Sequence, residues 1–106
     1  MKHKNWMVLL LKEEPQKTYF NLQDAEKIAK KLGIDFTKTK FDLKQFQMGL
    51  NTELEHGSKF ANTNITYNDP IMTAKIALAH LQEFPDYYTR LRKLENEAIA
   101  FWAKNQ

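Results

Sequence analysis

The sequence predicts an all-α protein, a compact bundle of four to five helices. Apolar residues recur at the three- and four-residue spacing of helices along most of the chain. Only three Gly and three Pro occur in 106 residues, too few for the many tight turns of a β fold. This length is typical of one core, so residues 1–106 are predicted to form a single helical domain.

The first clear helix begins after Asn21, which can cap it together with Asp24, and ends at Gly33. Residues 5–13 fit either a short buried strand or a helical turn and a half. Helix is favoured because no partner strand is evident. The structure of the N-terminal segment, residues 1–19, is left open.

A second helix is predicted between Asp42, its cap, and Gly57, its stop. Its apolar residues form one stripe: Leu43, Phe46, Leu50 and Leu54. Residues 58–68 form the longest loop. Asp69 and Pro70 then start a third helix that is apolar nearly all round, which predicts a central, buried position.

Pro85 and Asp86 precede the last predicted helix, which continues to about Lys104. Its apolar residues share one face: Tyr87, Leu91, Leu94, Ala98, Phe101 and Trp102. We expect this whole face to pack against the core of the bundle.

Composition points to a cytoplasmic protein without a membrane segment. Cysteine is absent, and the apolar run at residues 7–11 is too short for a signal peptide or for the roughly 20 residues of a membrane span. The net charge is +3, but basic residues are interleaved with acidic ones, which disfavours nucleic-acid binding. The oligomeric state is not determined by the sequence.

Two histidine–carboxylate pairs form the candidate site: Glu53 with His56, and His80 with Glu83. Helical-wheel positions turn Glu53 and His80 inward and leave His56 and Glu83 at the boundary. Buried polar groups need partners, which predicts a cluster near the start of the last helix, where it is joined by Asp86, Tyr87 and Tyr88. The two pairs meet only if the long loop runs back along the bundle and brings together the C-terminal ends of the second and third predicted helices.

Three interpretations of this cluster compete. In the favoured one its members satisfy each other, for example Glu53 with His80 and His56 with Glu83, or accept hydrogen bonds from Tyr87 or Tyr88. In the second they bind one divalent ion, Zn²⁺ or Mn²⁺, through Glu53, His56, His80 and Glu83. In the third His80 is a catalytic base tuned by Glu53 without a metal.

These interpretations lead to ranked functions. The leading one is a binding or structural module with an unidentified macromolecular partner. Its His/Glu cluster organises the core and is a possible site for one divalent metal ion. The alternatives are a metal-dependent, hydrolase-like enzyme that uses the same four residues and a weak nucleic-acid-binding protein. The sequence favours binding over catalysis, because it contains no Cys nucleophile and no Gly-rich phosphate loop.

Two strings give the chain a resemblance to known sequences: Glu53-Leu-Glu-His-Gly57 and His80-Leu-Gln-Glu-Phe-Pro-Asp-Tyr-Tyr88. They resemble a family of uncharacterised small helical proteins of bacteria and their phages. The likeness begins upstream at Ala25–Phe36 and leaves out the first 19 residues. It implies kinship and a phage-related context, and it implies no mechanism.

Overall fold

The computed structural model describes residues 19–59, 61–64, 66 and 68–105. Over these residues the chain forms α2 (Leu22–Lys31), α3 (Leu43–Lys59), the short 3₁₀ helix η1 (Ala61–Thr63), α4 (Pro70–Glu83) and α5 (Tyr87–Lys104), without a strand. The predicted all-α bundle of four to five helices is therefore confirmed. The prediction for residues 5–13 lies outside the described residues.

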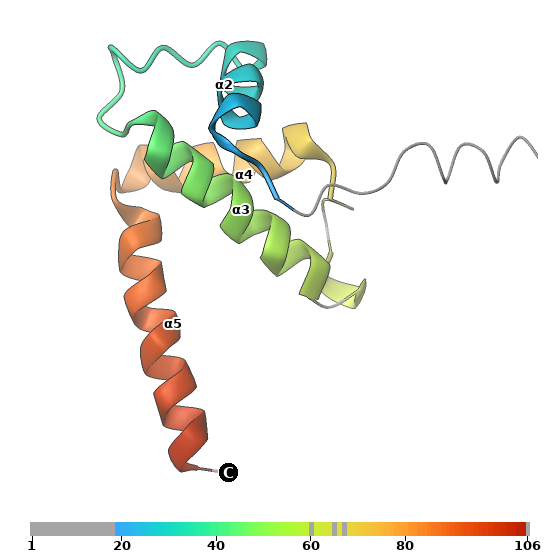
Figure 1. The fold of residues 1–106 in the computed structure, drawn as a ribbon, viewed down its shortest axis with the longest axis vertical. Coiled ribbons are helices and arrows are strands. Elements are labelled where there is room, and N and C mark those ends of the chain that lie inside the picture. The colour runs from blue at the N-terminus through green and yellow to red at the C-terminus, as the bar shows by residue number, and fades with distance from the viewer. Residues whose placement is uncertain (1–18, 60, 65, 67, 106) are drawn as a thin grey trace, which may run out of the picture.

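Helix α3 occupies the centre of the arrangement and contacts α2, α4 and α5 (Figure 1). Helix α4 passes behind α3 and runs in the opposite direction. Helix α5 starts beside the N-terminal half of α3 and then extends away from the other helices. The C-terminal ends of α3 and α4 are thus apart, and the predicted crossover that would join them is wrong.

The predicted caps explain where three helices begin. Asn21 and Asp24 form a capping box, in which each side chain accepts a hydrogen bond from the backbone N–H of the other, at 2.8 and 3.0 Å. Asp42 accepts from the backbone of Gln45 at the start of α3. Asp69 accepts from the backbone N–H of Met72, at 2.8 Å, at the start of α4.

Gly57 does not end α3 as predicted, because the helix continues to Lys59. A Cβ atom at position 57 would lie 3.1 Å from Oδ1 of Asn64 and 3.3 Å from Oγ1 of Thr66. The glycine therefore lets the following loop pack closely against the helix. Gly33, in contrast, has a φ of +71° in the turn after α2, as expected of a glycine that ends a helix.

The core lies where α2, α3, α4 and the first turn of α5 meet. Its buried apolar residues are Phe20, Ala25, Ile28, Ala29, Phe41, Phe46, Leu50, Leu54, Ala74, Ala77, Leu81 and Tyr88. Helix α4 buries only one side, since Met72 and Ala79 are exposed. The predicted burial of α4 on nearly all sides is wrong, because α2, α3 and α5 contact it and no further described helix covers its outer side.

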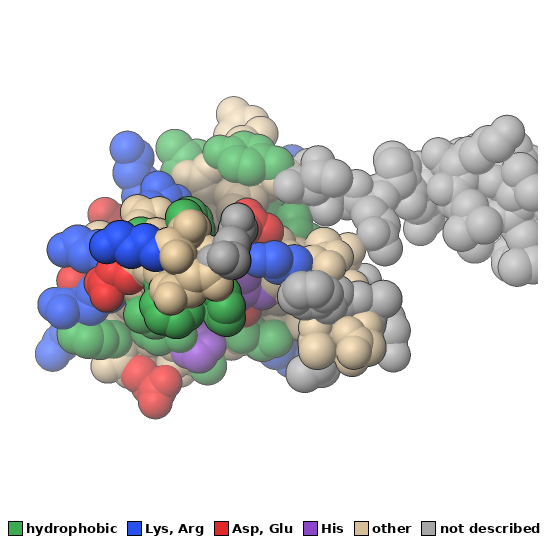
Figure 2. All heavy atoms as spheres, turned by 90° about the horizontal axis from the view of Figure 1, so that it is seen from below, with side chains coloured by type: hydrophobic (Ala, Val, Ile, Leu, Met, Phe, Trp, Pro, Cys, Tyr) green, Lys and Arg blue, Asp and Glu red, His purple; other side chains and the backbone are tan. Residues whose placement is uncertain are grey.

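Helix α5 departs furthest from the prediction. Tyr88 is its one buried residue, and the apolar side chains beyond Leu91 are more than half exposed: Leu94, Ile99, Phe101 and Trp102. The expected packing of the whole face fails because α5 extends past the helices that would cover it (Figure 1). Seen from the side toward which α5 extends, hydrophobic side chains lie at the surface among charged ones (Figure 2). No helix in the described part of the chain is long and apolar enough to cross a bilayer.

Candidate functional site

Three helices meet at one carboxylate oxygen. Tyr88, in the first turn of α5, donates from its hydroxyl to Oε2 of Glu53 on α3 at 2.7 Å. Nε2 of His80, on α4, lies 3.8 Å from the same oxygen. The predicted contacts of Glu53 with His80 and with a tyrosine are both present. We call these three residues the Glu53 cluster.

The Glu53 cluster forms because α3 and α4 cross close together. A Cβ atom on Gly49 would lie 3.1 Å from Cβ of Ala77 and 2.7 Å from the ring of Tyr88. Glu53 and His80 follow Gly49 and Ala77 by about one helical turn on their respective helices, so both remain near the crossing. The missing side chain at position 49 is what admits the tyrosine ring.

Aromatic contacts fix the orientation of the His80 ring. The Tyr87 ring stacks on it with 4.3 Å between centroids and 8° between planes. The Tyr88 ring meets His80 edge-on at 6.1 Å and Tyr87 edge-on at 4.9 Å. Nδ1 of His80 is buried and has no hydrogen-bond partner among the described residues.

Burial decides the electrostatics of this cluster. The Glu53 side chain is 13% exposed and that of His80 33% exposed. Burial of Tyr88, with the Glu53 carboxylate beside it, raises the pKa of the phenol well above its ordinary value. Tyr88 is therefore a protonated donor at any physiological pH, and Oε2 of Glu53 accepts its hydrogen bond.

His56 is not part of the Glu53 cluster. Its Nε2 lies 2.9 Å from Oε2 of Glu95 on α5, and both side chains are exposed by more than two fifths. The predicted pairing of His56 with Glu83 is thus replaced by a surface pair that bridges α3 and α5. The reason is that α3 and α4 diverge beyond their crossing, so residues further along each helix face different neighbours (Figure 1).

Glu83 and Asp86 also lie elsewhere. Glu83 lines a groove of about 750 Å³ between the end of α4 and the segment at residues 32–41. Asp86 pairs with Nε of Arg90 at 2.9 Å, and that hydrogen bond holds the pKa of the Asp86 carboxyl below its ordinary value. Of the predicted site residues, Glu53, His80, Tyr87 and Tyr88 come together, whereas His56, Glu83 and Asp86 do not.

The arrangement does not match the donor set of a mononuclear metal centre. Within the described part of the chain, no three His, Cys, Asp or Glu side chains lie together where they could bind an ion. A zinc site needs three or four protein ligands, and the contact between Glu53 and His80 provides two. Metal binding stays a prediction for which these residues supply an incomplete set.

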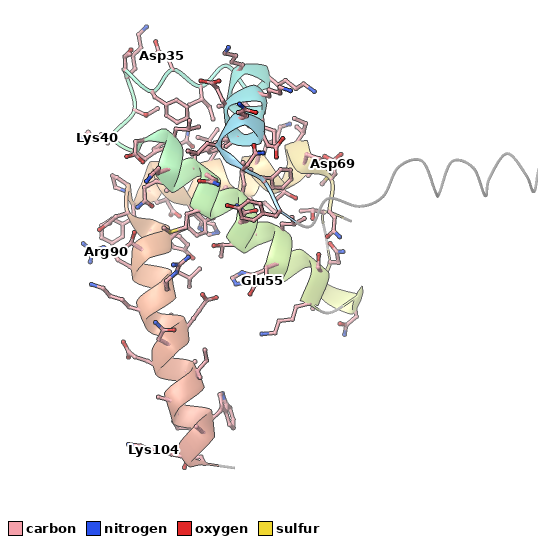
Figure 3. All side chains as sticks on the ribbon, viewed as in Figure 1. Asp35, Lys40, Glu55, Asp69, Arg90 and Lys104 are labelled. Carbon is pink, nitrogen blue, oxygen red and sulfur yellow. The ribbon has the colours of Figure 1, made fainter. Side chains whose placement is uncertain are left out.

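A second feature, which the sequence did not reveal as a site, is a groove of about 780 Å³ between α3 and α5. It is lined from α3 by Thr52, Glu55 and Lys59 and from α5 by residues that include Arg92, Glu95, Ile99 and Trp102. Glu55 lies on the part of α3 that borders this space (Figure 3). No signal in the sequence reveals it, because the apolar face of α5 has the same pattern whether or not neighbouring helices cover it.

A model of a protein family of unknown function (DUF5661) matches residues 25–97. The chain belongs to this family. The match covers most of α2, all of α3 and α4 and the first part of α5, so it includes all three residues of the Glu53 cluster. The family description assigns no activity, and neither a curated protein nor a solved structure matches the chain.

Proposed function

We propose that this protein is a binding module, and that the groove between α3 and α5 holds an apolar segment of a partner protein. The observation that carries the proposal is the exposure of Ile99 and Trp102, 68% and 62%, beside that groove. Exposed aromatic and aliphatic side chains that line a concave surface are typical of interaction sites.

The Glu53 cluster supports binding over catalysis. Its carboxylate already accepts a short hydrogen bond from Tyr88, and His80 is stacked on Tyr87. Neither Glu53 nor His80 lines the groove. A general base has to reach a proton of a bound substrate, and the one cluster residue that lines the groove is Tyr88, which already donates its hydroxyl proton to Glu53. We infer that the cluster anchors α5 to α3.

The lining of the groove indicates the chemistry of its ligand. Ile99 and Trp102 supply apolar surface, whereas Glu55, Lys59 and Arg92 place both signs of charge around it. Two helices that diverge around an apolar surface favour a third helix with one apolar face. The acidic side chains disfavour nucleic acid, whose phosphates they would repel. A partner segment with an apolar face and mixed charges fits best.

The expected setting of this binding module is a reducing cytoplasm, in bacteria or their phages. Support comes from the absence of cysteine and from the Glu53–Gly57 and His80–Tyr88 strings. In such a setting a small module with an exposed groove between α3 and α5 would act within a larger assembly.

Binding can be tested with a displayed library of amphipathic helical peptides, selected on the full chain. Selected peptides should shift NMR signals of Thr52, Glu55 and Ile99 and should lose binding to the Ile99→Glu variant. Glu97→Gln is the matched control, because Glu97 is exposed on α5 and does not line the groove. Peptides that bind Ile99→Glu as well as the wild type, or that shift signals elsewhere, would refute the proposal.

A further inference from the structure

The apolar face of α5 is continuous, but only its first part has a partner. Tyr88 is buried and Leu91 is half-buried against the core, whereas Leu94, Ile99 and Trp102 on the same broad face are exposed. Such a face is normally covered when a protein is alone in solution. The exposed part of this face is therefore expected to be covered by another segment of polypeptide.

A shallower groove leads from the start of the described chain to this face. It is lined by Tyr19 at one end and by Thr52, Glu55 and Arg92, which also line the groove between α3 and α5. The two grooves therefore share a wall. A chain that arrives at Tyr19 can follow this path along α3 to α5.

The attachment of the chain at this point is well defined. Phe20 is 2% exposed, its backbone N–H donates to Oδ1 of Asn51 at 2.7 Å, and its carbonyl accepts from Nδ2 of Asn51 at 2.9 Å. Gln47 donates to the Tyr19 hydroxyl at 3.1 Å. Tyr19 and Phe20 are thus tethered to α3 beside the shallower groove.

The sequence on the N-terminal side of Tyr19 contains a suitable ligand. Residues 6–11, Trp-Met-Val-Leu-Leu-Leu, form a run of six apolar side chains. The eight residues from Leu11 to Tyr19 span up to about 26 Å when extended. This span lets the run follow the wall that the two grooves share, at Thr52, Glu55 and Arg92, toward α5 of the same molecule.

We infer that residues 6–11 occupy the groove between α3 and α5 and cover Ile99 and Trp102. This inference rests on the proposed function, since it names an internal ligand for the same groove, which a partner segment would displace. A six-residue apolar run and an apolar helix face both lose contact with water when they meet, which favours their association.

Paramagnetic relaxation tests the inference, because the chain contains no cysteine and accepts a single labelled one. A nitroxide on Ala103→Cys, whose parent residue lines the groove, should broaden the amide signals of residues 6–11. The same label on Lys30→Cys should leave them sharp, because α2 and α5 do not touch in the described part of the chain. Leu10→Asp should abolish the broadening, and Lys17→Asp should preserve it.

A mixed sample identifies other occupants. In this sample the Ala103→Cys protein carries the nitroxide but no ¹⁵N, and the wild-type protein carries ¹⁵N but no nitroxide. If the amide signals of residues 6–11 broaden, a second copy covers the groove and the inference is overturned. Absence of broadening in both samples also overturns it. Neither of these two results contradicts the proposed function, because that proposal is tested by the effect of Ile99→Glu on peptide binding.

Discussion

The hydroxyl of Tyr88 donates a 2.7 Å hydrogen bond to Oε2 of Glu53, and this bond joins the first turn of α5 to the middle of α3. His80 lies 3.8 Å from the same oxygen. A carboxylate that is only 13% exposed needs such partners, because its charge is costly to desolvate. The attachment of α5 thus depends on a polar contact as well as on apolar packing.

Tyr88→Phe should destabilise the protein. The variant keeps the buried ring and removes the donor to Glu53, so the expected loss is about 1–3 kcal/mol in the free energy of unfolding. Urea denaturation followed by circular dichroism measures it. His56→Ala removes a surface contact with Glu95 and should cost less than about 1 kcal/mol. Equal losses in the two variants would contradict the assigned role of Tyr88.

Alkaline pH should weaken the wild type more than Tyr88→Phe. The pKa of Tyr88 is raised in the folded state by burial and by Glu53, whereas the unfolded chain releases the proton near pH 10. The stabilisation by Tyr88 is therefore complete below pH 10 and declines above it, by up to about 1.4 kcal/mol per pH unit. Unfolding free energies between pH 8 and pH 11.5, about two units below and one and a half units above the ordinary tyrosine pKa, measure the effect. Parallel curves for the two proteins would refute it.

Gly49→Ala should destabilise the protein, although alanine is the better helix former by about 1 kcal/mol. The added Cβ would lie 2.7 Å from the Tyr88 ring, which is 1% exposed and is held by the hydrogen bond of its hydroxyl to Glu53. Overpacking of this kind costs about 1–3 kcal/mol. Thermal and urea denaturation measure the loss.

The cause of that loss can be isolated in a double-mutant cycle. In a Tyr88→Ala background the ring is absent, and Gly49→Ala should become neutral or stabilising. If the substitution costs the same in both backgrounds, the contact with Tyr88 is not its cause.

The prediction of a metal centre has a direct test. If Glu53, His56, His80 and Glu83 bind Zn²⁺ or Mn²⁺, untagged protein should contain stoichiometric metal that is lost in His80→Ala. The separation of His56 and Glu83 from the Glu53 cluster leads us to expect the opposite. Elemental analysis should then find no stoichiometric metal, and neither ion should change the melting temperature. Retained metal that depends on His80 would overturn this expectation.

Much of the fold could be predicted because local chemistry determines it. The capping box at Asn21 and the cap at Asp69 fix helix starts through hydrogen bonds within three residues. The stripe on α3 predicted its buried residues, including Phe46 and Leu50. The end of α3 was predicted wrongly at Gly57. A sequence does not distinguish a glycine that ends a helix from a glycine that lets a loop pack closely against one.

The candidate site was predictable only in part, because it depends on how two helices cross. The wheel positions of Glu53 and His80 indicated that they face inward, and their contact follows from the crossing near Gly49. The wheel could not show that His56 would find Glu95 instead of Glu83. It also could not show that α5 extends beyond its neighbours, since helix length in a sequence carries no information on what lies beside it.

The attachment of α5 by its first turns makes the helix a lever. Its 18 residues are about 27 Å long, so a tilt of about 5° at Tyr88 moves the far end by about 2 Å. The width of the groove at Trp102 therefore depends on the angle of α5, which the Tyr88–Glu53 bond and the His56–Glu95 pair both fix against α3. A ligand that narrows the groove therefore strains the Tyr88–Glu53 hydrogen bond. By linkage, a substitution at Glu53 alters the affinity for that ligand.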